Sequence, residues 1–375
     1  RVVDLNCSSL KDDDIHWADW VFVSGMEIHR GSVDHIARRC HALDRKVIGG
    51  GPLFRSDPDL NPDVDHVVVG EAEEQVAGLI ADLVAGRPAP LYEAARFPDL
   101  AHTPIPRWDL LDLSRYATLS VQSCRGCPFD CEFCDVVALN GRKPRYKSPR
   151  QFVAELEALR ALGWQGPVFV VDDNFIGDLR RCRELLQAII AWRRRTGTRM
   201  IFITEASVNM AAHPDLLELM VRAGFKKVFL GLETPNAESL RECRKAQNLR
   251  ENLTESVRTI QAAGLEVMGG FIVGFDSDEP DIFQRQFDFI QKAGVVTAMV
   301  GLVQALPRSR LYQRLADEGR LRSDGDGNNT SATMTFEPRM DREFLETGYR
   351  KLVRRLYEPG NYYGRILTFL ESHKM

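Results

Sequence analysis

Four cysteines within eleven residues constrain this chain more than any other feature of its sequence. They are Cys124, Cys127, Cys131 and Cys134 in the segment SCRGCPFDCEFCD, and the other four cysteines stand singly. Thiolates are preferred ligands of zinc and of iron–sulfur clusters. Structural zinc usually draws close ligand pairs from separated segments, so four ligands on one short loop would close its tetrahedron poorly. Three thiolates on one loop can hold three corners of a [4Fe–4S] cube and leave its fourth iron open to a ligand.

The composition is that of an ordinary globular protein. The 375 residues suffice for two or three domains, and the net charge of −4 gives no reason to expect nucleic acid as a partner. No apolar run is long enough for a transmembrane helix, and no secretory signal is visible. Scattered cysteines in a chain of this length favour a reducing cytoplasm over a disulfide-stabilised secreted protein.

Residues 1–95 alternate short apolar runs with helical patterns, which predicts a parallel, doubly wound sheet. Strands are expected in RVVDL (1–5), WADWVFVSGM (17–26), RKVIGGGP (45–52) and DHVVVGEAEE (65–74). Because the chain opens inside the first of these strands, we expect an N-terminal portion to precede Arg1. Such sheets bind ligands beyond the carboxyl ends of their strands, where the glycines of SGM and GGGP fall. The Pro-rich residues 96–115 are predicted to be a linker.

Residues 116–310 repeat the strand–helix rhythm with longer helices. Strands are expected in ATLSVQS, GPVFVVDD, RMIFITEAS, KKVFLGLE, LEVMGGFIVGF and VTAMVGLVQAL. Six such units make an open or partial barrel, whose functional residues gather at the carboxyl ends of the strands. The cysteine cluster follows the first of these strands. Residues 311–375 predict a small helical domain after the glycine-rich loop SDGDGNNTSATM.

The spacing C-x3-C-x2-C of Cys127, Cys131 and Cys134, with aromatic Phe133 before the last cysteine, resembles the motif of the radical S-adenosylmethionine (SAM) superfamily. The resemblance implies that the three thiolates hold a [4Fe–4S] cluster whose open iron chelates the methionine part of SAM. One electron then cleaves SAM to a 5′-deoxyadenosyl radical, which abstracts hydrogen from an unactivated carbon. Cys124 lies outside the motif and is expected to be a packed, unligated residue.

The resemblance also implies SAM-binding residues at the ends of the second, third and fourth strands. Asp172, Asp173 and Asn174 stand where the family often has Gly-Gly-Glu opposite the amino group of SAM. Glu205 and Glu233 are candidates for the ribose hydroxyls or the amino group. Helix capping by Asp173 and salt bridges by the two glutamates stay open as alternatives.

The fifth and sixth strands complete the expected SAM site. The segment GGFIVGF resembles the family's adenine-contact element through Gly270, Ile272 and Gly274, with Ser277 in place of its final Glu. Gln304, after the sixth strand, is expected either to face the cavity or to satisfy a neighbouring loop.

Residues 1–95 resemble the cobalamin-binding domain that precedes the barrel in one branch of these enzymes. Ser24 stands at one of that domain's marks, and Gly49 and Gly50 at another, where missing side chains would admit the cobalamin nucleotide tail. By strand order RVVDL is the second strand, so the mark D-x-H-x-x-G is expected before Arg1. Cobalamin binding therefore stays open beside a purely structural role.

Taken whole, the chain resembles the cobalamin-binding-domain branch of radical SAM proteins that carries a C-terminal helical domain of unknown function and includes hopanoid C2 methylases. This implies cobalamin-dependent C-methylation of a small, apolar substrate, with a reductant such as flavodoxin or ferredoxin. One alternative is radical rearrangement, cyclisation or C–C bond formation without cobalamin. Another, from a different class, is a non-catalytic, zinc-stabilised binding protein.

Overall fold

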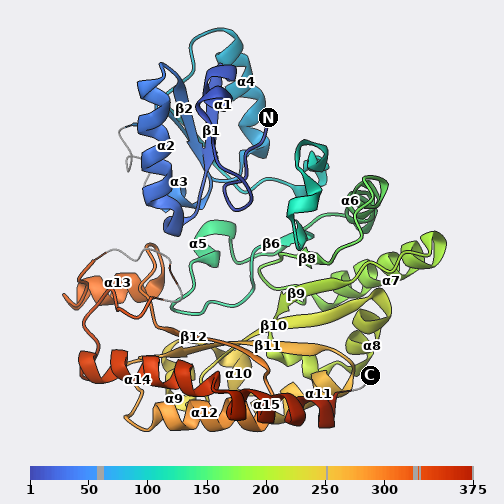
Figure 1. The fold of residues 1–375 in the computed structure, drawn as a ribbon, viewed down its shortest axis with the longest axis vertical. Coiled ribbons are helices and arrows are strands. Elements are labelled where there is room, and N and C mark those ends of the chain that lie inside the picture. The colour runs from blue at the N-terminus through green and yellow to red at the C-terminus, as the bar shows by residue number, and fades with distance from the viewer. Residues whose placement is uncertain (57–62, 251, 324–327, 329–330, 374–375) are drawn as a thin grey trace. The chain divides into compact units, whose positions relative to one another are not determined.

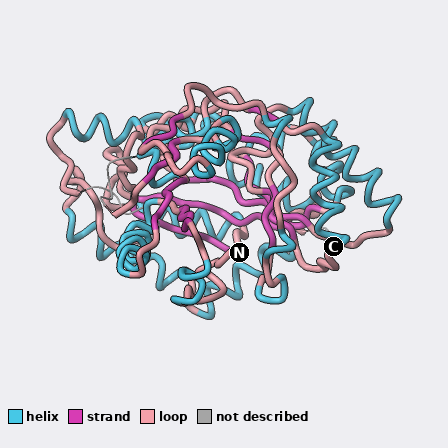
Figure 2. The backbone as a smooth tube through the Cα atoms, turned by 90° about the horizontal axis from the view of Figure 1, so that it is seen from above, coloured by secondary structure: helices cyan, strands magenta, loops and turns pink. Residues whose placement is uncertain are grey.

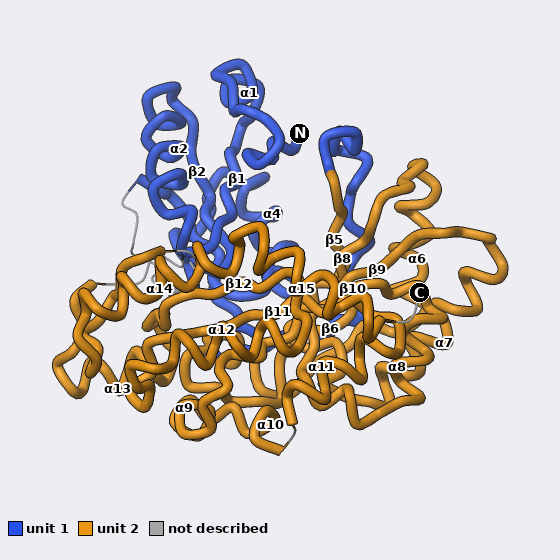
Figure 3. The backbone as a smooth tube through the Cα atoms, turned by 60° about the horizontal axis from the view of Figure 1, so that its bottom comes forward, with its two compact units in different colours: residues 1–116, 138–140, 325–328 blue, residues 117–137, 141–324, 329–375 orange. Residues whose placement is uncertain are grey.

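The computed structural model describes residues 1–56, 63–250, 252–323, 328 and 331–373. They form two compact units, a smaller one made mainly of residues 1–116 and a larger one made mainly of the residues after 116 (Figure 3). Each unit has its own parallel sheet. The division falls at Tyr116 and places residues 96–115 with the smaller unit. The domain boundaries given above stay predictions.

The smaller unit is built on a parallel sheet with strand order β1-β2-β3-β4, of which Figure 1 labels β1 and β2. Its strands are β1 (Trp20–Ser24), β2 (Lys46–Gly50), β3 (His66–Val69) and β4 (Leu91–Glu93). Its helices are α1 (Asp12–Trp17), α2 (Arg30–Ala42), α3 (Pro52–Ser56) and α4 (Val76–Val84), with 3-10 turns η1 (Glu27–His29), η2 (Ala72–Glu74), η3 (Leu100–His102), η4 (Trp108–Leu110) and η5 (Leu113–Arg115).

Both faces of this sheet carry an apolar core, because successive side chains of a strand point to opposite faces. Val67 and Val69 of β3 lie in one buried cluster with residues of α2 and α3. Val68, between them, lies in a second cluster with Leu79 of α4. Helices on both faces of a parallel sheet confirm the predicted doubly wound layout.

The strand predicted at 1–5 is wrong. Residues 1–4 belong to no helix or strand. The amide N–H groups of Cys7 and Ser8 donate hydrogen bonds to the carbonyl of Asp4, which forms a turn. The Asp4 carboxylate accepts the amide N–H of Asn6 at 2.9 Å, which is the local side-chain bond that favours turns over ladders. The first strand of the described chain is therefore β1, and the strand count that made RVVDL the second strand fails.

The larger unit is built on a parallel sheet whose strand order, β5-β8-β9-β10-β11-β12, follows the chain. Its strands are β5 (Leu119–Val121), β8 (Val168–Val170), β9 (Phe202–Ala206), β10 (Phe225–Glu233), β11 (Glu266–Val273) and β12 (Thr297–Leu302). Each lies in one of the six predicted segments, except that β10 begins one residue before its segment, at Phe225. When every strand lies beside its predecessor through right-handed crossovers, the helices share one face and the sheet curls into an open barrel.

The helices of this unit connect and cover the strands (Figure 2). They are α6 (Pro149–Ala161), α7 (Leu179–Thr196), α8 (Pro214–Ala223), α9 (Ala237–Glu242), α10 (Ala246–Leu249), α11 (Leu253–Ala262), α12 (Ile282–Ala293), α13 (Arg310–Asp317), α14 (Arg342–Leu356), α15 (Pro359–Ser372) and the 3-10 turn η6 (Val208–Ala212). The short helix α5 (Val136–Asn140) is divided between the units, because its residues 138–140 belong to the smaller one. Local signals set the bounds of α6. The Ser148 hydroxyl caps its start by accepting the amide of Gln151, and Gly163 follows its end with φ +81°.

The C-terminal helices predicted from sequence are present, and α14 and α15 pack against α12. Arg365 of α15 is fully buried with its guanidinium 5.4 and 5.5 Å from the ring centres of Tyr357 and Tyr362. It donates to the carbonyls of Leu356 and Val296, which ties α15 to the start of β12. Much of the predicted loop at 323–334 lies outside the described residues. Of the helices that the structure describes, none has the length and apolar character to cross a membrane.

Candidate active site

The cysteine loop leaves the carboxyl end of β5 and is closed by a small antiparallel ladder that the sequence did not predict. Strand β6 (Cys124–Arg125) pairs with β7 (Arg145–Tyr146), with Cys124 opposite Tyr146. Cys124 is fully buried in this ladder, as expected for a packed residue. The ladder joins the two ends of the loop, and of the four thiols in this segment Cys124 alone belongs to it.

Those three thiols share one electrostatic environment. All are free, Cys131 is buried, and Cys127 and Cys134 are half-buried. Burial raises the pKa of each, to about 12 for Cys134, while the charge of Lys245 acts on all three in the opposite direction. The amide of Gln247 donates to the sulfur of Cys131 at 3.8 Å. Metal binding would therefore release protons from these thiols.

Asp172 and Asp173, after β8, bind the backbone of the cysteine loop. Asp172 is 1% exposed, and its Oδ1 accepts the amides of Ser123 at 2.6 Å and Cys124 at 3.0 Å. Oδ2 of Asp172 accepts the Ser123 hydroxyl. Oδ2 of Asp173 accepts the amide of Gly126 at 2.6 Å. The first two residues of the predicted Asp-Asp-Asn turn thus fix the loop that carries the cysteines.

Asn174 is also buried and joins the ends of two strands. Its Nδ2 donates to the Ser207 hydroxyl at 3.2 Å, and its Oδ1 accepts the Ser207 amide at 3.3 Å. Ser207 directly follows β9. This bond pair fixes the neighbouring carboxyl ends of β8 and β9.

A cavity of about 340 Å³ opens at the carboxyl ends of the strands beside the cysteine loop. Seven of the predicted site residues line it: Phe133, Cys134, Glu205, Glu233, Gly270, Ile272 and Gln304. Its apolar wall consists of Phe229, Phe271, Met299, Leu302, Val303 and Leu306. Cys127, Cys131, Asp172, Asp173, Asn174 and Gly274 do not line it. Residues from five separate segments of the sequence thus meet at one place.

The two glutamates of the cavity differ in their surroundings. Glu233 has φ +60° and its carboxylate pairs with the Lys245 ammonium at 2.7 Å, with side chains only 7% and 13% exposed. Glu205 has no hydrogen bond or ion pair from its side chain within the described part of the chain. Burial raises its pKa, and the charge of Asp173 raises it further. Glu205 is thus a carboxylate open to a ligand, and Glu233 is one already paired.

The remaining predicted residues divide between the cavity and its supports. Gly270 lies where a side chain would meet the ring of Phe229. Gly274 has φ +100° and faces Leu345 of α14 and not the cavity. Gln304 lines the cavity while its Nε2 donates to the carbonyl of Thr333 at 3.0 Å, so it meets both expectations.

In the smaller unit, Ser24 and Gly50 are register partners at the carboxyl ends of β1 and β2. Ser24 lines a cavity of about 490 Å³. Beyond it, Gly51 has φ +88° and lies against the Ser24 hydroxyl. Gly49 differs, because the ring of Phe54 fills the space where its side chain would be. That glycine serves packing and leaves no room there for a ligand.

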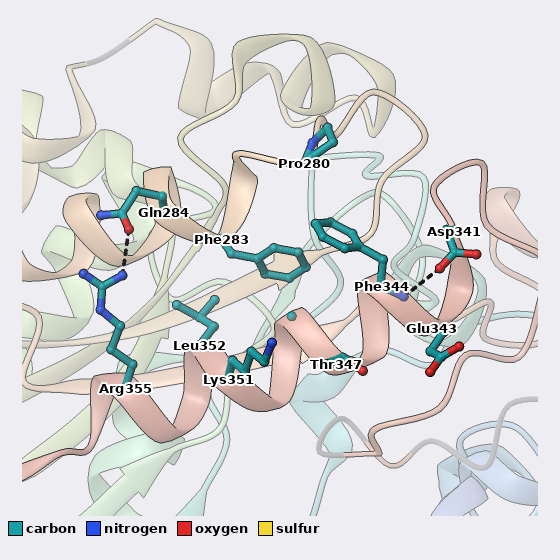
Figure 4. A pocket seen from close by; sticks show the side chains of 11 residues that line it. Pro280, Phe283, Gln284, Asp341, Glu343, Phe344, Thr347, Lys351, Leu352 and Arg355 are labelled. Carbon is teal, nitrogen blue, oxygen red and sulfur yellow. Dashed lines mark hydrogen bonds between the residues drawn. The ribbon is translucent and has the colours of Figure 1, made fainter.

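A larger cavity of about 530 Å³ lies elsewhere in the larger unit, between α12 and α14 (Figure 4). Phe283 and Phe344 meet across it edge to face at 5.9 Å. None of the predicted site residues lines it. The candidate site therefore rests on the chemistry of its residues and not on cavity size.

Sequence reasoning missed Lys245, Gln247 and the arginines of α13 that contact the cysteine loop. Lys245 stands in RECRKAQN, where nothing local distinguishes it from neighbouring basic residues. Within the described residues, no group of three or more His, Cys, Asp or Glu side chains is arranged to hold a metal ion. A [4Fe–4S] cube takes each thiolate at a separate iron, so its ligands stand further apart than those of one zinc ion.

Comparison with known proteins agrees with this fold and site. Residues 121–290 match the radical SAM superfamily, and residues 309–375 match a domain of unknown function, DUF4070. The chain is 39% identical over 368 residues to an uncharacterised methyltransferase of Synechocystis sp., covering 97% of this chain and 69% of that protein. It is 36% identical over 363 residues to hopanoid C-2 methylase of Rhodopseudomonas palustris, and the match covers 96% of this chain and 68% of that protein.

Solved structures show the same fold at low sequence identity. The radical SAM methyltransferase TsrM from Kitasatospora setae, solved with cobalamin and a [4Fe–4S] cluster, matches with a TM-score of 0.67 and 16% identity, covering 82% of this chain and 66% of that one. The cobalamin-dependent radical SAM enzyme OxsB, solved with aqua-cobalamin and SAM, matches with a TM-score of 0.61 and 16% identity. The match covers 97% of this chain and 49% of that one.

An open parallel barrel with a three-cysteine loop at the carboxyl end of its first strand defines the radical SAM class of enzymes. The chain belongs to this superfamily, in the methyltransferase family that includes hopanoid C-2 methylase. The enzymes of this superfamily use a [4Fe–4S] cluster and SAM. The chain spans about two thirds of the length of the two relatives named above.

Proposed function

We propose that this chain catalyses cobalamin-dependent methylation of an unactivated carbon, with Cys127, Cys131 and Cys134 as ligands of its [4Fe–4S] cluster. The observation that carries the proposal is that Cys134 of the three-cysteine loop lines one cavity together with Glu205 and Glu233. Lys245, which pairs with Glu233 at 2.7 Å, places a positive charge that acts on all three thiols. The donor set fits the cluster, since three free thiols on one loop leave one iron for SAM. When bound, cluster and SAM would supply the 5′-deoxyadenosyl radical that abstracts hydrogen.

The chain's own residues would bind and orient SAM. Glu205 would accept the ammonium or the ribose hydroxyls, because its carboxylate faces the cavity without a partner in the described residues. Gly270 and Ile272 would contact the adenine, and Phe133 and Gln304 would border the bound cofactor. Asp172, Asp173 and Asn174 would act by fixing the loop and the neighbouring strand ends, and Glu233 by holding Lys245.

The apolar wall of the cavity supports an apolar small-molecule substrate. Phe229, Met299 and Leu306 line the cavity together with Ile272, and Met299 is 47% exposed. An apolar wall binds a ligand by burying hydrocarbon surface and keeps water from a reactive radical. A reducing cytoplasm that holds flavodoxin or ferredoxin would supply the electron.

For cobalamin, the smaller unit offers Ser24 and Gly50 at adjacent strand ends, beside the left-handed turn at Gly51. These residues fit a ligand held by a hydroxyl and exposed backbone. Gly49 fits only as a packing position, since Phe54 fills its open side.

The test uses anaerobically reconstituted protein supplied with SAM, a low-potential reductant and cobalamin. We expect four irons per chain, bound corrinoid, and both 5′-deoxyadenosine and S-adenosylhomocysteine as products. Replacing Cys127, Cys131 and Cys134 by Ala should abolish the cluster and both products. SAM cleavage by that triple variant would refute the proposal. Formation of 5′-deoxyadenosine alone would indicate radical chemistry without methyl transfer, and a colourless, zinc-loaded protein would indicate a binding protein.

A further inference from the structure

Both chain neighbours of Cys131 are ion-paired to one helix, α13, which lies in the region matched to the domain of unknown function. Asp130 pairs with Arg310 at 2.7 Å. Glu132 receives two hydrogen bonds from Arg314, at 2.8 and 3.1 Å, in the forked geometry that an arginine makes with a carboxylate. The residues on either side of a predicted cluster ligand are therefore held from outside the loop.

The backbone of Glu132 is fixed as well. Its carbonyl accepts the amide of Leu311 at 2.8 Å, and its amide donates to the carbonyl of Cys243 at 2.9 Å. The Glu132 side chain is 11% exposed and that of Arg314 is 28% exposed. Main chain and side chain thus both hold the short segment between Cys131 and Cys134.

Arg314 also connects the loop to the turn after β11. Its Nη1 donates to Asp276 at 2.9 Å, and Arg320 donates to both oxygens of the same carboxylate at 2.6 and 2.8 Å. The amides of Asp276 and Ser277 donate in turn to Glu242. Without the arginines, the carboxylates of Glu132, Glu242 and Asp276 would stand together partly buried and repel one another.

We propose that α13 is a clamp on the cysteine loop, with Arg314 as the positioning residue that keeps Cys131 and Cys134 at the spacing the cluster requires. The inference rests on the proposed function and assigns a role to the start of the C-terminal region. Arg314 does not line the candidate cavity, and it acts through Glu132.

The experiment compares Arg314→Met with Arg322→Met in the full chain. Arg322 also makes two hydrogen bonds to a carboxylate, that of Glu337, but this pair is exposed and, among the described residues, forms no hydrogen bond or ion pair with the cysteine loop. After anaerobic reconstitution, iron release to a ferrous chelator should be about tenfold faster in Arg314→Met, the scale on which outer-shell partners affect metal affinity. Arg322→Met should match the wild type. Arg314→Lys should be intermediate, because it keeps the charge and loses the fork.

Two further measurements keep the outcome decisive. The electron paramagnetic resonance signal of the reduced cluster should broaden or shift in Arg314→Met, which a purely structural loss of stability would not cause. In iron-free protein, alkylation of Cys131 should be faster than in the wild type. If Arg314→Met does not fold, Glu132→Gln serves the same comparison.

The clamp proposal would be overturned if Arg314→Met or Glu132→Gln had the same iron-release rate, spectrum and alkylation rate as the wild type. Failure of the wild type itself to take up iron would instead count against the proposed function, and the alkylation of iron-free protein would still test the clamp.

Discussion

The carboxylate of Asp172 accepts the backbone N–H of Cys124 at 3.0 Å, across 48 positions of the sequence. The same oxygen accepts the amide of Ser123, so one buried side chain determines where the cysteine loop leaves β5. Asp172 follows β8, the strand next to β5. The second strand thereby fixes the start of the loop that follows the first.

Replacing Asp172 by Ala should destabilise the iron-free protein by about 2–4 kcal/mol, because two buried amides lose their acceptor. Asp172→Asn is the matched control. Its amide oxygen can still accept both N–H groups, so we expect a loss below about 1 kcal/mol. Denaturant unfolding measures both, and equal losses in the two variants would contradict this role.

Asp172 should also make stability depend on pH. Burial raises its pKa to about 6, and the hydrogen bonds it accepts only partly oppose this effect. The Asp172 carboxylate interacts electrostatically with the titratable groups of Asp173, Cys124, Cys182 and Tyr146. Since the folded pKa lies above the unfolded one, this contribution is complete below the unfolded pKa and is lost as pH rises through about 6. The unfolding free energy of wild type minus that of Asp172→Asn should therefore fall between about pH 4 and 6.5, and a difference that does not change with pH would refute this prediction.

Breaking the pair between Lys245 and Glu233 should be costly. Lys245→Met leaves Glu233 buried and unpaired, which should destabilise the protein by about 3–5 kcal/mol. Adding Glu233→Gln removes that charge, so the double variant should be more stable than Lys245→Met alone. Thermal and denaturant unfolding of the wild type, both single variants and the double variant measure the interaction energy between the two groups. Simple additivity would show that the two groups do not interact.

Glu205 should control the pH dependence of SAM binding. Its pKa is raised by burial and then by Asp173, so its charge is lost at a higher pH than that of an ordinary glutamate. SAM affinity should therefore decline as pH falls through this raised pKa. Glu205→Gln should bind SAM about tenfold more weakly, with no such pH dependence. Glu218→Gln, a change in an exposed residue of α8, is the control for equilibrium dialysis.

Cys124→Ala should leave the cluster intact, whereas Cys127→Ala should not. Cys124 is fully buried in the β6–β7 ladder, so its loss should cost stability on the order of 1 kcal/mol. Iron content and the visible spectrum after reconstitution separate the two variants. A loss of iron in Cys124→Ala equal to that in Cys127→Ala would make Cys124 a ligand.

Met299→Trp should impair substrate turnover without removing the cluster, because the larger side chain would occupy space in the cavity beside its apolar wall. Iron content should stay at the wild-type level, while uncoupled SAM cleavage should persist. Phe344→Trp, in the separate cavity between α12 and α14, is the matched control. Equal effects of the two changes would argue against an apolar substrate at the candidate site.

The sequence by itself determined what local patterns can encode. Apolar runs gave the six strands of the larger sheet, Ser148 and Gly163 set the bounds of α6, and the cysteine spacing identified the loop that bears the chemistry. Such features depend on residues close together in the chain. RVVDL shows the limit of this reasoning, because a turn made by the Asp4 side chain overrode an apolar run with no strand beside it.

Only the tertiary structure decided which strand ends meet and which polar groups compensate one another. Nothing in the local sequence indicates three of these contacts. They are the ladder at Cys124, the pairing of Lys245 with Glu233, and the contact of Arg314 with Glu132 across 182 positions. The physical reason is that a buried charge requires a partner in space, and the chain can supply that partner from any distance along its sequence. Spacing therefore identified the cysteines, and folding determined what holds them.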